Sequence, residues 1–91
     1  MINLATCDHL AISSLVKKKT KLSYSFQLFA AIDIVLTFRY FRDFEAKSVK
    51  YELLGTYSER VIERSLRTLL DFGIVIKTHN RYSVVPYEYN H

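Results

Sequence analysis

Residues 58–86 read SERVIERSLRTLLDFGIVIKTHNRYSVVP, and this stretch decides the fold. Apolar residues recur in its first half at the spacing of one helical face: Ile62, Leu66, Leu69 and Leu70, with Val61 at the edge. Ser58 is a good N-cap for such a helix, while Thr56-x-x-Glu59 offers a competing capping box two residues earlier. The pattern therefore predicts a helix that begins near Ser58.

The second half of the stretch predicts a β-hairpin. Gly73 can take the left-handed conformation that commonly ends helices, and β-branched residues follow it at once. The runs Ile74–Lys77 and Tyr82–Val85 have strand chemistry and are joined by residues 78–81. Asn80 tolerates a positive φ and suits a tight turn there.

The outward face of the predicted helix carries three arginines. Arg60, Arg64 and Arg67 are spaced four and three apart and form one basic ridge, with Glu59 and Glu63 on the same side. The planar guanidinium can reach base edges in the major groove or hold a phosphate with two hydrogen bonds. The alternative is a solvated face whose arginines pair with the two glutamates at i,i+3 and i,i+4.

A second short helix is predicted just upstream. Residues 46–54, AKSVKYELL, carry Val49, Leu53 and Leu54 on one side, lysines at 47 and 50, and Gly55 at the end. Two short helices separated by a turn of a few residues make a helix-turn-helix pair, here over residues 46–72.

These residues resemble a known family. The run from Tyr57 to Leu66, followed by Leu69 and by Gly73-Ile74-Val75, is similar to the recognition helix and the start of the wing in winged helix-turn-helix regulators of microbes and archaeal viruses. The resemblance covers roughly residues 45–86. It implies a mainly α fold with a small β-hairpin, a winged helix-turn-helix with an extra N-terminal helix and a wing at 74–86. Winged helices also serve as protein–protein modules.

The expected function is sequence-specific binding of double-stranded DNA by a small transcription regulator. The predicted base contacts are Glu59, Arg60 and Arg64, since a glutamate can accept from cytosine N4. The predicted phosphate contacts are Lys50, Ser58, Arg67, Lys77 and Arg81. The alternatives are a winged-helix assembly module that meets an acidic protein, and a plasmid or viral protein for partition or for binding a replication origin.

The upstream half supplies the core and suggests a dimer. Residues 23–42 are almost entirely apolar, which predicts a core helix covered on most sides; Asp33 and Arg39 argue against a membrane span. An N-terminal helix, roughly Asp8–Lys19 within residues 1–22, places its apolar residues against that core: Leu10, Ile12, Leu15 and Val16. A second copy, contacting through the N-terminal helices, is predicted to cover the remainder; the alternative is a monomer whose core the N-terminal helix completes by itself. The expected assembly is a two-fold homodimer that presents two recognition helices about 34 Å apart.

Composition fits one small intracellular domain over residues 1–91. The net charge is +4 and the pI near 9.3, the sign expected of a nucleic-acid binder. The run VKKKTK at 16–21 is either a solvated helix end or a further phosphate contact. Cys7 is the only cysteine, and the first residues lack signal-peptide features, so a cytoplasmic location is expected. No zinc-ligand spacing or phosphate-binding glycine loop occurs, so we expect no enzyme activity, metal or cofactor.

Overall fold

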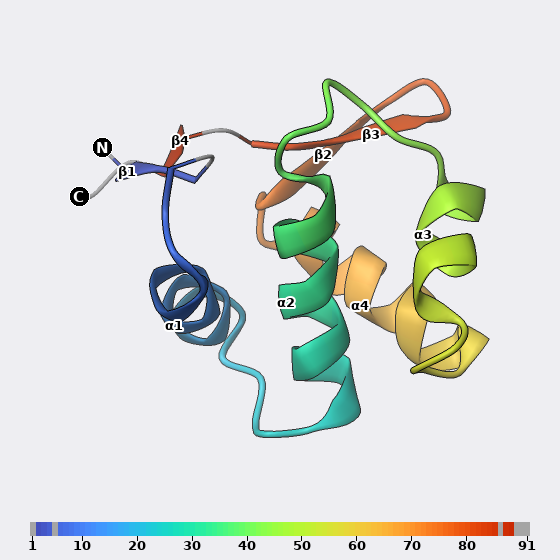
Figure 1. The fold of residues 1–91 in the computed structure, drawn as a ribbon, viewed down its shortest axis with the longest axis horizontal. Coiled ribbons are helices and arrows are strands. Elements are labelled where there is room, and N and C mark those ends of the chain that lie inside the picture. The colour runs from blue at the N-terminus through green and yellow to red at the C-terminus, as the bar shows by residue number, and fades with distance from the viewer. Residues whose placement is uncertain (1, 5, 86, 89–91) are drawn as a thin grey trace.

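The computed structural model describes residues 2–4, 6–85 and 87–88; Pro86, the last residue of the predicted wing, lies outside them. The helices of these ranges are α1 (His9–Thr20), α2 (Phe26–Phe38), α3 (Ala46–Leu53) and α4 (Glu59–Asp71) (Figure 1). The strands β2 (Val75–Thr78) and β3 (Arg81–Val84) form an antiparallel hairpin, and β1 (Ile2–Asn3) pairs with β4 (Tyr87–Glu88). The prediction of a mainly helical chain with a small hairpin is confirmed.

The ends of α4 follow from local chemistry. The Ser58 hydroxyl accepts from the backbone N–H of Val61 at 3.2 Å, so the helix begins at Glu59 and the capping box at Thr56 is not used. At the other end Gly73 has φ +73°, and the N–H of Ile74 donates to the carbonyl of Leu69 at 3.0 Å. This is the left-handed helix end that the sequence predicts.

The core is built around α2, which lies between α1 and the α3–α4 pair (Figure 1). Its buried residues are Leu28, Ala30, Ala31, Ile34, Val35 and Phe38. The other helices add Ile12 and Val16 from α1, Val49 and Leu53 from α3, and Ile62, Leu66 and Leu69 from α4. The segments outside the helices add Leu4, Phe44, Ile74, Val75 and Val84. The apolar face predicted for α4 is therefore the face that the structure buries.

Three details of the predicted burial are wrong. Leu10 is 79% exposed, because α1 turns Ile12 and Val16 inward and Leu10 lies on the opposite side of the helix. Leu54 is half exposed, since Leu53 takes the buried position at the end of α3. The helix α2 is also less covered than predicted: Phe26, in its first turn, is 70% exposed.

A backbone bridge ties the hairpin to the loop between α2 and α3. Phe44 donates its N–H to the carbonyl of Tyr82 at 2.7 Å and accepts from the N–H of Tyr82 at 2.8 Å. The ring of Phe44 stacks between Tyr82 and Phe38, with centroid separations of 5.9 and 4.5 Å. At the hairpin tip the positive φ belongs to His79, at 57°, and not to Asn80 as predicted. Phe44 therefore pairs with β3 by a bridge of one residue, and no pattern in the sequence signals this contact.

Candidate nucleic-acid interface

The outer face of α4 carries the predicted basic ridge. Arg60, Arg64 and Arg67 are all exposed, and they project from a helix whose opposite face is buried. Among the described residues, neither Arg60 nor Arg64 has a carboxylate partner, and Arg67 has only Asp71, at 3.6 Å between two well-exposed side chains. Such a surface pair contributes little energy and is easily exchanged for another anion. The ridge is therefore available to a negatively charged ligand.

The two glutamates of α4 are held by a lysine from α3. The Lys50 Nζ lies 2.9 Å from Glu59 Oε1 and 3.0 Å from Glu63 Oε1. The hydrogen bonds to Glu59 and Glu63 raise the pKa of Lys50, and the hydrogen bond from Lys50 lowers the pKa of Glu59. The alternative in which the arginines of α4 pair with these glutamates is not what the structure shows, since the partner of both carboxylates is Lys50. Sequence spacing within α4 could not reveal this, because Lys50 comes from the preceding helix.

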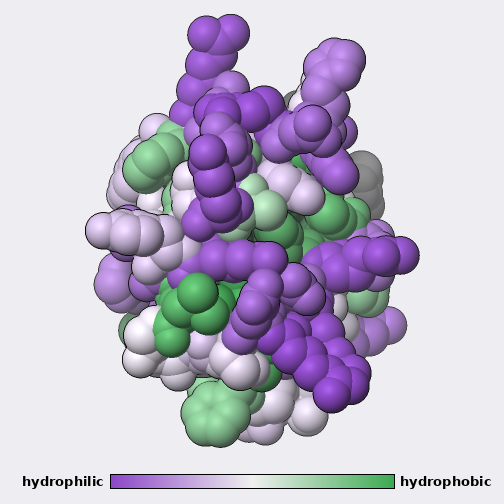
Figure 2. Space-filling model, turned by 90° about the vertical axis from the view of Figure 1, so that its right-hand side faces the viewer, coloured by the Kyte–Doolittle hydropathy of each residue, from purple (hydrophilic) through white to green (hydrophobic). Residues whose placement is uncertain are grey.

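A groove joins α3, α4 and the hairpin. It has a volume of about 350 Å³, and its polar lining comes from Lys50, Glu63, Arg67, Lys77 and Tyr82. The Lys77 ammonium lies 5.5 Å from the centroid of the Tyr82 ring. Viewed from the side that carries α3, hydrophilic side chains cover much of the molecule, with apolar ones between them (Figure 2). The groove thus brings together three of the predicted phosphate contacts: Lys50, Arg67 and Lys77.

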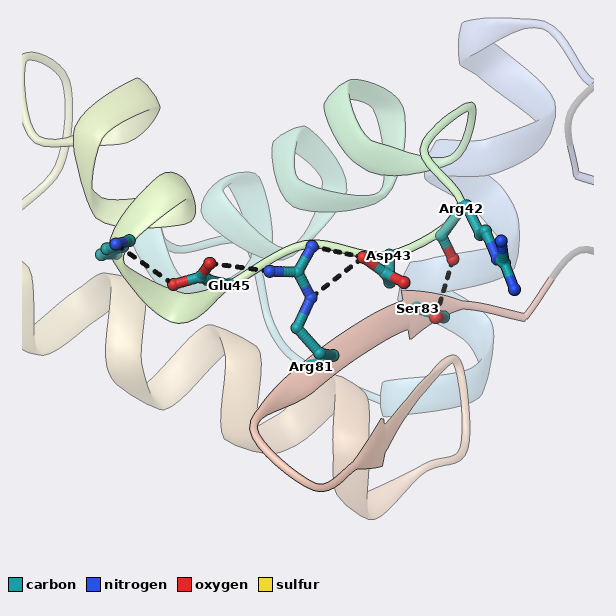
Figure 3. A network of polar contacts seen from close by, with 6 residues as sticks. Arg42, Asp43, Glu45, Arg81 and Ser83 are labelled. Atoms are coloured by element: carbon teal, nitrogen blue, oxygen red, sulfur yellow. Dashed lines mark hydrogen bonds and ion pairs between the residues drawn. The ribbon is translucent and has the colours of Figure 1, made fainter.

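Arg81, a further predicted phosphate contact, anchors the hairpin instead of standing free. Its guanidinium donates from Nε and Nη2 to Asp43 and from Nη1 to Glu45 Oε1 at 2.7 Å (Figure 3). Asp43 and Glu45 also raise the pKa of Arg81. Beside this cluster Ser83 donates to the carbonyl of Arg42 at 2.9 Å. No pattern in the sequence signals Asp43 and Glu45 as partners of Arg81, since they lie 38 and 36 positions away from it in a loop without periodicity.

Polar contacts with α2 set the position of α4. Ser65 is fully buried, and its hydroxyl lies 2.9 Å from the carbonyl of Gln27 and 2.7 Å from that of Val61. The Gln27 amide donates to the Thr68 hydroxyl at 2.9 Å. A serine at this crossing is small enough for α2 and α4 to approach closely while its hydroxyl remains hydrogen-bonded. The direction of the arginine ridge is therefore fixed by the core helix.

The turn between α3 and α4 is tied to the same helix. The Tyr57 hydroxyl donates to Asp33 Oδ2 at 2.6 Å. Desolvation and the neighbouring Asp33 raise the pKa of Tyr57 to about 12. In the sequence Asp33 stood out only as an interruption of an apolar helix. Its partner lies 24 positions away.

The Tyr57–Asp33 hydrogen bond predicts a pH effect on stability. Because the folded-state pKa of Tyr57, about 12, exceeds the ordinary value of 10.0, its contribution is complete below pH 10 and is lost as pH rises toward 12. Below pH 10 we expect Tyr57→Phe to lower the free energy of unfolding by about 1 kcal/mol, the usual value of one hydrogen bond. Urea denaturation of both proteins along a pH series measures this. The difference between them should shrink above pH 10, and a constant difference would contradict the assignment.

The structure also places Ser58, Glu59 and the lysine run of residues 16–21. Ser58 caps α4, and Glu59 lies in the first turn of that helix. In the lysine run, the Lys17 ammonium lies 3.7 Å from the centroid of the Tyr24 ring, and α1 lies across α2 from α3 (Figure 1).

In the described ranges no group of His, Cys, Asp and Glu side chains is arranged to hold a metal ion. No helix there has the length and apolar character that a membrane span requires.

In comparisons with known proteins, no family model matches this chain, and no curated protein or solved structure matches it.

Proposed function

We propose that this chain binds double-stranded DNA sequence-specifically, as a small homodimeric transcription regulator of the winged helix-turn-helix type. The observation that carries the proposal is the exposed pair Arg60 and Arg64, which has no described carboxylate partner because Lys50 holds both nearby glutamates. Two exposed, unpaired guanidinium groups on one helix face are suited to bases and phosphates.

The order of the elements supports the winged-helix part of the proposal. A core helix, α2, is followed by the Phe44 bridge, then α3, α4 and the β2–β3 hairpin. In a helix-turn-helix the second helix lies in the major groove, with the residues of its first turns nearest the bases. In this arrangement α4 is the recognition helix, and Arg60 and Arg64 face base edges in the major groove. The hairpin then lies beside the sugar-phosphate backbone of the DNA.

The remaining contacts divide according to their existing partners. Arg67 and Lys77 line the groove beside α4 and are assigned to phosphates. Ser58 accepts a hydrogen bond from Val61, which leaves its own O–H to donate to a phosphate. Glu59 uses Oε1 for Lys50, so Oε2 is assigned to cytosine N4. Lys50 and Arg81 each already hold two carboxylates, so we expect their phosphate contacts to be the weakest.

The test is binding to duplex DNA over a range of salt concentrations. Fluorescence anisotropy with a random-sequence duplex should give an affinity that falls steeply with salt, with a log–log slope of about −0.9 for each phosphate contacted. Selection of bound duplexes from a random pool should then yield a consensus, palindromic if the protein binds as a dimer. Absence of binding at low salt would reject the proposal and favour an assembly module whose arginine ridge meets an acidic protein. A role at a partition site or replication origin would use the same contacts. It would be recognised by occurrence of the selected consensus sequence at such a site in the DNA.

A further inference from the structure

A small hollow lies at the surface between α1 and α2. Its volume is about 210 Å³, roughly the share of seven water molecules and less than that of most small-molecule pockets. The buried Leu28 and the half-buried Ile32 line its base, and the exposed Leu10 and Tyr24 stand at its rim. It has room for one leucine or phenylalanine side chain. We call this feature the α1–α2 hollow.

The lysines beside the α1–α2 hollow account for the whole net charge of the protein. Residues 9–32 contain Lys17, Lys18, Lys19 and Lys21 and no acidic residue. The remaining basic residues equal the 9 acidic ones in number, so the net charge of +4 belongs to these four lysines. The described residues include no carboxylate partner for Lys17, Lys18 or Lys21. The hollow is therefore bordered by positive charge that is not balanced locally.

The dipole of α1 explains only part of this charge. Lys17, Lys18 and Lys19 lie in the last turn of the helix, where cations are favourable. The C-terminus of a helix carries only about half an elementary negative charge. Most of the positive charge is thus left to attract an external anion.

The lining of the α1–α2 hollow favours an acidic protein segment over a nucleic acid. Single-stranded nucleic acids bind largely by stacking their bases on aromatic rings. Among the lining residues the one ring is that of Tyr24, and the Lys17 ammonium already covers one face of it, 3.7 Å from the centroid. The rest of the apolar lining is aliphatic, which suits an apolar side chain and offers no stacking surface to a base.

We propose that the α1–α2 hollow binds an acidic segment of another protein, which inserts one large apolar side chain into the hollow and sets carboxylates against Lys17 and Lys18. A second copy of the same surface is the poorer match, because it brings lysines and no carboxylate. The helix α1 lies across α2 from α3 (Figure 1), so the segment and a duplex on α4 would contact different parts of the molecule. The proposal goes beyond the proposed function and does not rest on DNA binding.

Titration of the full chain with fluorescently labelled peptides tests the proposal. Each probe is a short run of glutamates with one leucine or phenylalanine at its centre, and the matched probe has alanine there. Fluorescence anisotropy at low salt should show saturable binding of the leucine or phenylalanine probe. The alanine probe should bind at least about tenfold more weakly, because it buries no large side chain. Added salt should weaken binding, because it screens the lysines.

Two variants of the hollow and one matched control locate the site. Charge reversal of Lys17 and Lys18 to glutamate should weaken peptide binding at least about tenfold, since like charges then face each other. Leu10→Glu should also weaken it, and this side chain is 79% exposed, so its replacement leaves the core intact. The control is the double variant Arg60→Ala, Arg64→Ala, which should bind the peptide as the wild type does. Circular dichroism melting checks that each variant is folded.

Four outcomes would overturn the proposal. The first is no binding of any glutamate probe, or equal binding of the alanine probe. The second is loss of peptide binding in the Arg60 and Arg64 variant, which would place the acidic segment on α4. The third is tighter binding of a labelled oligothymidine than of the peptides, lost on reversal of Lys17 and Lys18. The fourth is a wild-type dimer that Leu10→Glu dissociates in sedimentation equilibrium, which would assign the hollow to a second copy. The peptide titrations contain no DNA, so their outcome is separate from that of the proposed function.

Discussion

Replacing Arg60 and Arg64 together with alanine is expected to lower the affinity for the selected duplex by at least about 30-fold. Each arginine that reads a base contributes ~1–3 kcal/mol, and 1.4 kcal/mol corresponds to a factor of ten. Both side chains are exposed, so neither substitution should unfold the protein. Fluorescence anisotropy with the selected duplex and with a scrambled one measures the loss, which should be larger for the selected duplex.

The control for this pair is Lys18→Ala. It removes an exposed cation from α1, which lies across α2 from α3. We expect only a small effect of this change on affinity, with the same size for both duplexes. A double arginine variant that binds the selected duplex as tightly as the wild type would reject α4 as the reading helix.

Substitution of the α4 glutamates is expected to change DNA affinity in the opposite direction. Replacing Glu59 and Glu63 with glutamine removes two negative charges and releases Lys50 from both of its partners. Affinity for DNA of any sequence should then rise and the salt dependence should steepen, because Lys50 becomes free to contact a phosphate. Preference for the selected duplex should fall if Glu59 accepts from a cytosine. An acidic-protein partner for the ridge would instead leave DNA affinity low in every variant.

Phe38→Ala is expected to have the largest effect on stability. The side chain is 1% exposed, and its ring centroid lies 4.5 Å from that of Phe44 and 5.2 Å from that of Phe41. Removing a buried phenylalanine ring costs ~3–5 kcal/mol, and a domain of this length is stable by only about 5–14 kcal/mol in total. Phe38 also supports Phe44, which carries the backbone bridge to the hairpin. Loss of this ring should therefore loosen the hairpin as well as the core.

Phe26→Ala is the matched control for this prediction. It removes the same ring from the same helix, but Phe26 is 70% exposed and its nearest ring partner, Tyr57, has its centroid 6.5 Å away. Urea denaturation followed by circular dichroism should show a much lower midpoint for Phe38→Ala and a midpoint near that of the wild type for Phe26→Ala. Equal midpoints would contradict the packing described for α2.

The secondary-structure elements of this protein could be predicted where the interactions that form them are local in the sequence. The periodicity of Ile62, Leu66 and Leu69 sets the buried face of α4, Ser58 caps its start and Gly73 ends it. Each of these effects acts within one or two turns of the chain. The arginine ridge follows from the same periodicity, because the residues opposite a buried face are exposed. The exposure of Leu10 and Leu54 did not follow, since it depends on how each helix is rotated against its neighbours.

What only the tertiary structure decided is the electrostatic state of the candidate site. The sequence allowed the α4 glutamates to pair with the α4 arginines, but Lys50 from α3 pairs with both of them, and Arg60 and Arg64 have no carboxylate partner within the described part of the chain. From the sequence, Arg81 was predicted to be a free cation at the hairpin turn. In the folded chain it pairs with Asp43 and Glu45. Hydrophobic periodicity is local and can be read along the chain. Ion pairing depends on distances of a few ångströms between residues far apart in sequence, and folding alone creates those distances.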